Sequence, residues 1–290
     1  MCRAHPVRYE AAATVLALLL VTLMPSSAAV PTLDASAEWS AWREARAQAL
    51  LREDGWLALV GLHWLSEGEN RVDELPGVWV LHQGKVRLEG NPPDGWLLDG
   101  QPSTSRELTT DHRGAADRLK YGTRQLQVIE RGGKLALRVW DSASPARTSF
   151  RGIDTFPYQA RFRIAATFEA FATPKEVETP SMVNIPQKEL VPGRVHFELD
   201  GKAYTLEPTS EKGGAKLSFV FRDRTAPAET YGAGRFLSAD APVDGKLVLD
   251  FNRAYNPPCA FTPHATCPMP RPENILPVRI DAGEKRVDGH

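Results

Sequence analysis

The stretch Val195–Pro208, VHFELDGKAYTLEP, contains two runs of alternating apolar and polar residues on either side of Asp200-Gly201. Alternation with a period of two places the apolar side chains on one face of a strand. An Asp-Gly pair favours a tight hairpin turn because both residues tolerate positive φ. The stretch therefore predicts a β-hairpin with one buried face.

Similar patterns occur through most of the chain. The further strand candidates are Gly55–Leu65, which is almost wholly apolar, and Val78–Leu88, Leu126–Asp141, Lys216–Asp223, Gly245–Tyr255 and Leu276–Lys285. Many short strands at close spacing are typical of a barrel or a sandwich. We therefore expect a mostly β protein with barrel- or sandwich-like antiparallel sheets.

One amphipathic helix is predicted, at the N-terminal end over residues 34–54. Asp34 or Ser36 can cap it, because a side-chain oxygen satisfies free amides of the first turn. Gly55 is a suitable stop. The apolar residues that fall near one stripe are Trp39, Trp42, Ala45, Ala49 and Leu50.

The domain organisation follows from these elements. Residues 55–172 form an expected N-terminal β-module, and residues 193–290 form a C-terminal one that contains a proline- and cysteine-rich loop. Between them, residues 173–192 carry four prolines that interrupt the periodicity, so we expect a linker or a long loop there.

The first 29 residues resemble a secretory signal peptide. Arg3 and Arg8 precede an apolar run, 11–24, and Ser27-Ala28-Ala29 supplies the small residues of a cleavage site. The run is shorter than the ~20 residues that span a bilayer. Cleavage before Val30 would leave 261 residues and change the formal charge from −1 to −2. We expect a periplasmic or extracellular protein with no integral membrane span in the mature chain.

Composition and motifs exclude several function classes. The nearly neutral charge gives no electrostatic reason to expect nucleic acid as a partner. The chain lacks a G-x-S-x-G elbow, an H-E-x-x-H motif, a Walker loop and a dinucleotide fingerprint after a strand. No cofactor is therefore predicted.

Polar residues concentrate in the last seventy positions, where we expect a pocket. On a strand, Asp250 and Asn252 would share the face opposite Phe251 and form the floor of that pocket. The alternative is that Arg235 forms a structural ion pair and the asparagines hold turns. The candidate pocket residues are Arg222, Asp223, Thr225, Glu229, Tyr231, Arg235, Asp250, Asn252, Tyr255, Asn256, Glu273 and Asn274.

Two cysteines remain after the signal peptide, Cys259 and Cys267. An even, small count in an exported protein favours one disulfide. The pattern C-x4-H-x2-C, with His264, would suit zinc, but no fourth ligand is evident. A cysteine nucleophile activated by the histidine is a third possibility. We predict the disulfide, with its loop packed beside the turn Thr230–Phe236, and no metal.

Four stretches resemble a known family. They are GLHWLSEGEN, FRDRTAPAETYGAGRFL, DFNRAYNPPCAFTPHATCP and PENILPVRIDAGEK, and together they are similar to the bacterial and archaeal domain of unknown function 1684, from about Trp39 to Lys285. The elements F-x-D-x-T and T-Y-G-x-G-R of that family correspond to residues 221–225 and 230–235. The resemblance implies no activity.

Three functions are consistent with these observations. The first is binding of a small molecule or glycan through the C-terminal polar pocket. The second is a hydrolase in which Asp223, Asp250 or Glu273 act as general acid and base. The third is a structural envelope protein without a ligand. A cavity facing Arg235 would favour binding, whereas a filled, ion-paired cluster would favour a structural role.

Overall fold

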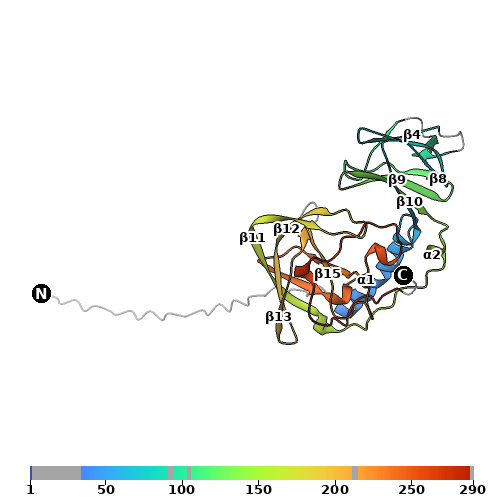
Figure 1. Cartoon of the computed structure of the whole chain (residues 1–290). Helices are drawn as coiled ribbons and strands as arrows, with labels where there is room; N and C mark the ends of the chain where they lie inside the picture. Colours follow the sequence, from blue (N-terminus) through green and yellow to red (C-terminus); the bar gives the residue numbers. More distant parts are fainter. Residues whose placement is uncertain (2–33, 91–94, 103–105, 211–214, 288–290) are drawn as a thin grey trace. The chain divides into compact units, whose positions relative to one another are not determined.

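A computed structural model describes Met1 and residues 34–90, 95–102, 106–210 and 215–287 (Figure 1). The predicted signal peptide, apart from Met1, lies outside these residues. None of the described helices combines the length and the apolar content that crossing a bilayer requires.

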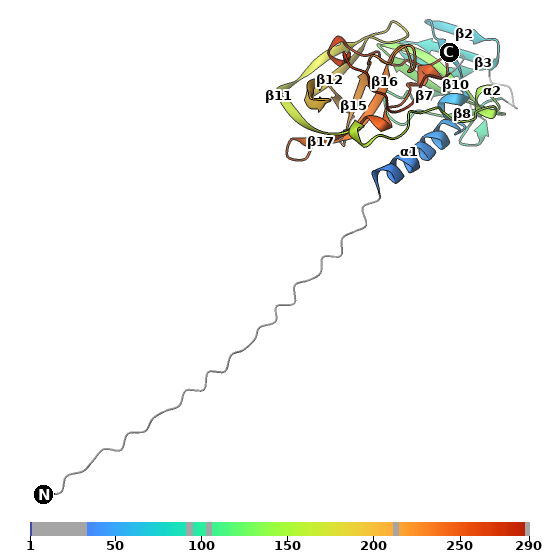
Figure 2. The same ribbon diagram turned by 90° about the horizontal axis from the view of Figure 1, so that it is seen from below.

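The predicted N-terminal helix is present as α1 (Ala35–Leu50), capped by Asp34, whose Oδ1 accepts from the amide of Ser36 at 3.3 Å. Trp39 and Leu50 are buried as expected. The predicted stripe differs from the buried face, however, because Ala45 and Ala49 are exposed. The half-buried side chains on that face include Trp42 and Arg46, and the Arg46 guanidinium lies over the rings of two aromatic residues. Figure 2 shows α1 as a long helix below the sheets.

The sequence after α1 forms two antiparallel sheets. Their strands are β1 (Leu59–Trp64), β2 (Gly68–Val72), β3 (Leu75–His82), β4 (Lys85–Glu89), β5 (Leu97–Leu98), β6 (Gln101–Pro102), β7 (Glu107–Leu108), β8 (Leu119–Tyr121), β9 (Arg124–Arg131) and β10 (Lys134–Asp141). One sheet has the order β1-β10-β9-β8-β5-β6, and the other has the order β2-β3-β4-β7. Leucine, valine and tryptophan side chains between them form one hydrophobic core, which includes Trp79 and Trp96.

Two further sheets are built from the C-terminal half. Their strands are β11 (Arg163–Thr179), β12 (Gln187–Leu199), β13 (Lys202–Leu206), β14 (Thr209–Ser210), β15 (Lys216–Phe221), β16 (Arg235–Asp240) and β17 (Lys246–Asp250). They pair as β13-β12-β11-β17 and as β14-β15-β16. Both sheets contribute to a second core, whose fully buried members include Phe219, Phe221 and Phe251. Each sheet has two edge strands, so the described strands form open, sandwich-like sheets and close no barrel.

Short helices fill several connections. They are η1 (Trp56–Ala58), α2 (Pro145–Thr148), η2 (Ala160–Phe162), η3 (Phe251–Arg253), η4 (Pro258–Ala260) and η5 (Pro272–Asn274).

The predicted hairpins have the expected turns. Asp200-Gly201 joins β12 to β13 with φ of 51° and 73°, and Gln83-Gly84 joins β3 to β4 with φ of 49° and 73°. Gly132-Gly133 joins β9 to β10 in the same way. Positive φ at both central residues is the geometry whose twist matches that of the flanking strands.

The structure differs from the expected linker at residues 173–192. Most of this segment belongs to the long hairpin of β11 and β12, and the chain from Asp34 onward is one compact unit. Pro174 and Pro192 fall where the pairing register shifts between Ala170 and Lys175. Proline lacks the amide that a ladder needs, and a bulge removes that need.

Two strand predictions are corrected towards the C-terminus. Leu276–Lys285 forms no strand, and its one isolated β-bridge pairs Glu284 with Thr155. The predicted strand through Asn252 ends at Asp250, whose Oδ1 accepts from the amide of Asn252 at 3.1 Å and caps η3. The two polar side chains therefore do not share a strand face.

Candidate functional site

Arg235, the centre of the predicted pocket, is 1% exposed and lies in a filled ion-paired cluster. Its Nη2 lies 3.1 Å from Oδ1 of Asp223, and its guanidinium also donates to the carbonyls of Ile280 and Ala282. Burial lowers the pKa of Arg235, and the neighbouring Asp223 carboxylate opposes this shift. Arg235 lines none of the cavities described below. This arrangement corresponds to the alternative in which Arg235 forms a structural ion pair and does not face a ligand pocket.

The Asp223 carboxylate also forms hydrogen bonds that hold the surrounding backbone in place. Its carboxylate accepts from the hydroxyl of Thr225 at 2.9 Å and from the amide of Ile280 at 2.8 Å. The hydroxyl of Thr225 is in turn 2.8 Å from that of Thr230. These bonds fix the turn before β16 to the C-terminal segment.

The three predicted asparagines are also buried and bind backbone groups. Asn274 accepts from the amide of Glu207 at 2.8 Å, and Asn252 donates to the carbonyl of Gln159 at 3.0 Å. Asn256 donates to the carbonyl of Lys285 at 2.7 Å. They hold loops in place, as the structural alternative predicts for asparagines.

The remaining predicted residues are dispersed. Arg222, Glu229 and Glu273 are at the surface or near it, and Glu229 pairs with Arg279 at 2.7 Å. Asp250 and Tyr255 line a cavity, which is described below. Tyr231 donates its hydroxyl to the carbonyl of Cys259 at 3.1 Å, so the predicted contact between this turn and the cysteine loop is present. The twelve residues do not converge on one pocket.

A cavity of about 960 Å³, here called the α1 cavity, lies elsewhere. Its walls come from α1, from the segment 150–155 that follows α2, and from residues 284–287. The lining residues are Ser40, Trp42, Arg43, Glu44, Arg46, Ala47, Leu51, Phe150, Arg151, Gly152, Ile153, Asp154, Thr155, Glu284, Arg286 and Val287. Sequence reasoning missed all of them.

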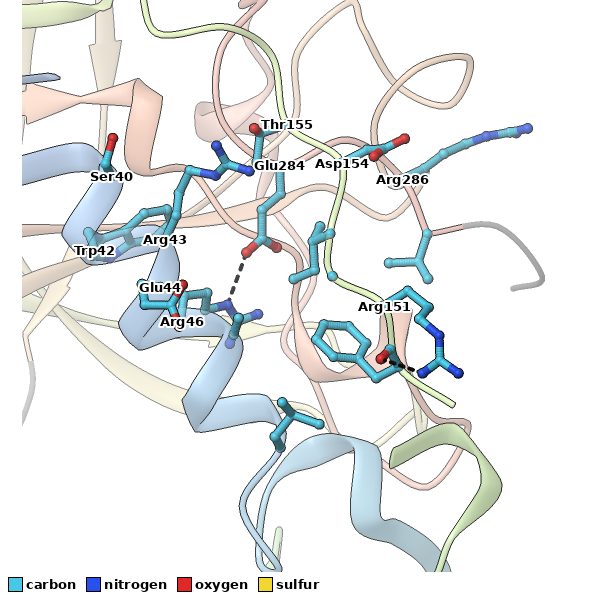
Figure 3. A pocket seen from close by; sticks show the side chains of 16 residues that line it. Ser40, Trp42, Arg43, Glu44, Arg46, Arg151, Asp154, Thr155, Glu284 and Arg286 are labelled. Carbon is cyan, nitrogen blue, oxygen red and sulfur yellow. Dashed lines mark hydrogen bonds and ion pairs between the residues drawn. The ribbon is translucent and has the colours of Figure 1, made fainter. Parts of the chain in front are cut away.

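Glu284 lies inside the α1 cavity and pairs with Arg46 of α1 (Figure 3). The Arg46 Nε is 3.0 Å from Oε1, and the Asn256 amide donates to Oε2 at 2.6 Å. The glutamate side chain is 2% exposed. Burial raises the pKa of Glu284, while Arg46 acts in the opposite direction.

Three other arginines of the cavity make no ion pair with any described residue: Arg43, Arg151 and Arg286. Arg43 stacks over the ring of Trp39 at 4.8 Å, and Arg151 donates to the carbonyl of the preceding residue. In Figure 3, Arg43 extends from the helix towards Thr155, and Arg286 points away from Glu284. The α1 wall and the 150–155 wall of the cavity therefore each supply a guanidinium donor.

A second cavity of about 530 Å³ shares Trp42 and Arg46 with the first. Tyr255 and Trp56 contribute further rings, and the other residues are mostly charged. Those charged residues are Glu38, Arg163, Lys216, Asp240, Asp250 and Arg253. Within this group Arg253 pairs with Glu38 at 3.2 Å and with Asp250 at 3.4 Å. This second cavity combines aromatic faces with charged hydrogen-bonding groups.

The predicted disulfide is not shown, because Cys259 and Cys267 are free thiols in the structure. The amide of Cys259 donates to Sγ of Cys267 at 3.1 Å. A hydrogen bond between the two thiols lowers the pKa of Cys259 and raises that of Cys267, and Arg138 of β10 favours both thiolates. Among the described residues no group of three or more histidine, cysteine or acidic side chains is arranged to hold a metal ion.

Together the fold and the sites define a mostly β protein with one N-terminal helix and a polar cavity beside it. Residues 148–285 match the family described as "Protein of unknown function (DUF1684)", which supports the expected resemblance over this part of the chain. The match begins well after Trp39, and it leaves α1 and the first two sheets outside.

Solved structures are also similar to part of the chain. One of them is the solution NMR structure of an uncharacterised protein from Haloarcula marismortui, with 29% sequence identity and a TM-score of 0.42. The similarity covers 50% of this chain and 82% of that one. A search of curated proteins found no match.

Proposed function

We propose that this chain is a binding protein that holds a small molecule with an anionic group in the α1 cavity. The observation that carries the proposal is the presence of Arg43 and Arg151, on opposite walls, without carboxylate partners among the described residues. A guanidinium presents paired donors that match a carboxylate or phosphate. The cavity volume of about 960 Å³ falls in the range of roughly 300–1,000 Å³ that is common for small-molecule sites.

The charge balance narrows the kind of ligand. Four arginines and three acidic residues line the cavity, and one opposite-charge pair, Arg46 with Glu284, is already formed. The surplus of one positive charge gives weak long-range attraction. Recognition would therefore depend on directional hydrogen bonds from Arg43 and Arg151, with Trp42 and Phe150 contacting an apolar part of the ligand. A small carboxylate or phosphate ester with an apolar portion fits this combination.

A sugar is the second candidate, and the second cavity favours it. Trp42, Trp56 and Tyr255 supply ring faces, and Asp240 and Lys216 supply hydrogen-bonding groups beside them. Aromatic side chains with one apolar face and polar neighbours suit a ligand that has apolar C–H faces and hydroxyl edges.

A thermal-shift screen of the mature protein tests both candidates. The probes are small carboxylates, phosphate esters and neutral sugars. A ligand at a hundred times its Kd should stabilise the fold by about 2.7 kcal/mol, or roughly 5–10 °C in Tm. Arg43→Gln and Arg151→Gln should abolish an anion-induced shift, whereas Arg161→Gln, at an exposed arginine paired with Asp200, should not. Equal shifts in all three variants would overturn the anion site.

We also propose that the protein is exported, with cleavage near Val30, and that Cys259 and Cys267 become bonded in the oxidising compartment. The apolar run at 11–24 and the small residues before Val30 support export. The contact between the two cysteines supports the bond. Mass spectrometry of the exported protein tests the first proposal, since retention of Met1 contradicts cleavage. Thiol titration after unfolding tests the second, since two reactive thiols contradict the bond.

A further inference from the structure

Arg138 is a buried charge without a carboxylate partner at hydrogen-bond distance among the described residues. It is 5% exposed, its Nε has no hydrogen-bond partner, and its one hydrogen bond from a terminal nitrogen is a 3.4 Å contact with the hydroxyl of Thr266. Burial lowers the pKa of Arg138 to about 10. A buried cation without an anion is costly, so an anion close to it would be strongly favoured.

Both thiols of the Cys loop, residues 259–267, interact electrostatically with Arg138. Thr266, its hydrogen-bond partner, precedes Cys267 directly. Trp56 lies under the guanidinium at 5.7 Å, and both Trp56 and Cys259 pack against the hydrophobic cluster that contains Cys267. Asp111 also raises the pKa of Arg138, but its carboxylate already pairs with Arg131 at 2.8 Å. A thiolate of the Cys loop is therefore the further anion that this arrangement can supply.

We propose that Cys259 and Cys267 form a thiol–disulfide exchange site in which Cys259 is the attacking sulfur and Arg138 stabilises its thiolate. Cys259 is partly exposed, whereas Cys267 is 4% exposed, so an incoming disulfide reaches Cys259 first. A structural disulfide needs neither an accessible sulfur nor a cation beside it, so exchange is a further function of this cysteine pair.

The exchange takes a small-molecule or protein disulfide as its oxidant. The thiolate of Cys259 attacks one sulfur of that disulfide, which forms a mixed disulfide and releases one thiolate of the oxidant. Cys267 loses its proton and attacks the sulfur of Cys259, which closes the internal disulfide and releases the second thiolate. The protein loses two electrons and two protons, and the oxidant becomes two thiols.

Other titratable groups that face the pair also affect its reactivity. The hydroxyl of Tyr231 donates to the carbonyl of Cys259, and partial burial raises the pKa of this phenol. Burial lowers the pKa of His264, which lies inside the Cys loop near His63, so the His264 imidazole is neutral near pH 7. Arg138 is therefore the cation that acts on the thiols at neutral pH.

The first experiment identifies the attacking sulfur. The reduced mature protein is mixed with oxidised glutathione and followed by intact mass. The wild type should form the internal disulfide, and Cys267→Ala should stop at the glutathione adduct of Cys259. Cys259→Ala should react at least tenfold more slowly, because its remaining thiol is buried. Equal rates for the two single variants would overturn the assignment of Cys259 as the attacking sulfur. An exported protein whose Cys259–Cys267 disulfide cannot be reduced and reoxidised while the protein stays folded would overturn the exchange site.

The second experiment tests Arg138 through the pH profile of alkylation. In the wild type the apparent pKa should fall below the ordinary thiol value of about 8.5. Arg138→Met should slow alkylation roughly tenfold near neutral pH, which is one pKa unit, and Arg138→Lys should restore part of the rate. Arg118→Met is the matched control, because Arg118 lies over the ring of Trp140 but pairs with Asp54.

The wild-type profile keeps the inference testable if Arg138→Met does not fold. An apparent pKa at or above the ordinary thiol value would overturn the role of Arg138 without any variant. Internal disulfide formation in the cell, measured by thiol titration, would still report on the proposed bond separately. The two proposals therefore fail by different results.

Discussion

Replacing Arg46 by methionine should make the protein easier to unfold, and this loss of stability should depend on pH. The substitution keeps an unbranched side chain over Tyr255 and Phe261 but removes the cation that pairs with Glu284 at 3.0 Å. The glutamate side chain is only 2% exposed, so the variant leaves a nearly isolated buried carboxylate. Breaking one side of a buried pair costs about 3–5 kcal/mol. We therefore expect Tm to fall by roughly 10 °C.

The sign of the pH dependence follows from the pKa of Glu284, which burial raises above its ordinary value of 4.5. The folded state then holds this proton more tightly than the unfolded state. Its contribution to stability is complete below pH 4.5 and declines as pH rises through the folded-state pKa. Loss of Arg46 raises that pKa further, so the destabilisation should be larger at pH 8 than at pH 4.

Urea unfolding at pH 4, 6 and 8 measures the effect, with Glu284→Gln and the double variant completing a cycle. The double variant should be more stable than Arg46→Met alone at pH 8, because no buried charge remains. The interaction between the two positions should be at least about 1 kcal/mol, as is typical of residues in direct contact. A loss for Arg46→Met that is the same at pH 4 and pH 8, with additive single effects, would refute this account of Glu284.

Three further predictions concern the scaffold. Asp223→Asn should cost about 3 kcal/mol or more in urea unfolding, because Arg235 would lose the one carboxylate that lies at hydrogen-bond distance from it among the described residues; a loss below 1 kcal/mol would contradict the structural role. Gly234→Ala should lower Tm, because φ is +99° and the added Cβ would lie 2.6 Å from a backbone oxygen of β15; an unchanged Tm would contradict that strain. Tyr231→Phe should cost about 1 kcal/mol by removing the hydrogen bond to the start of the Cys loop, and a neutral result would show that the bond is dispensable.

Local chemistry made much of the fold predictable. Asp200-Gly201 and Gly132-Gly133 adopt the positive φ values that their residue types favour, so each hairpin could be placed from a few neighbouring residues. The strand prediction for Leu276–Lys285 was wrong because its buried residues pack between other segments, with no strand pairing beyond the isolated bridge at Glu284. Its carbonyls at Ile280 and Ala282 bind Arg235 instead of a neighbouring strand.

The α1 cavity could not be predicted from local patterns. Arg46 and Glu284 are 238 positions apart, and neither occurs in a motif that indicates the other. The spacing of Arg43 and Arg46 on one predicted helix was the available signal, but charged residues on a helix surface are usually solvated. The buried residues of the predicted C-terminal pocket were misassigned for a related reason. Polar side chains that could bind a ligand, such as Asp223, can equally bind backbone amides and carbonyls.

Arg46 and Trp42 line both cavities, so ligands bound in the two proposed sites would be thermodynamically linked. A ligand in the second cavity that draws the Arg46 guanidinium towards itself weakens the bond to Glu284 and raises the pKa of that carboxylate. A more readily protonated Glu284 changes the charge that a ligand meets in the α1 cavity. Linkage is reciprocal, so each ligand must alter the affinity of the other by the same factor. A single turn of α1 would thus couple ligand binding in the α1 cavity to ligand binding in the second cavity, without a change in the sheets.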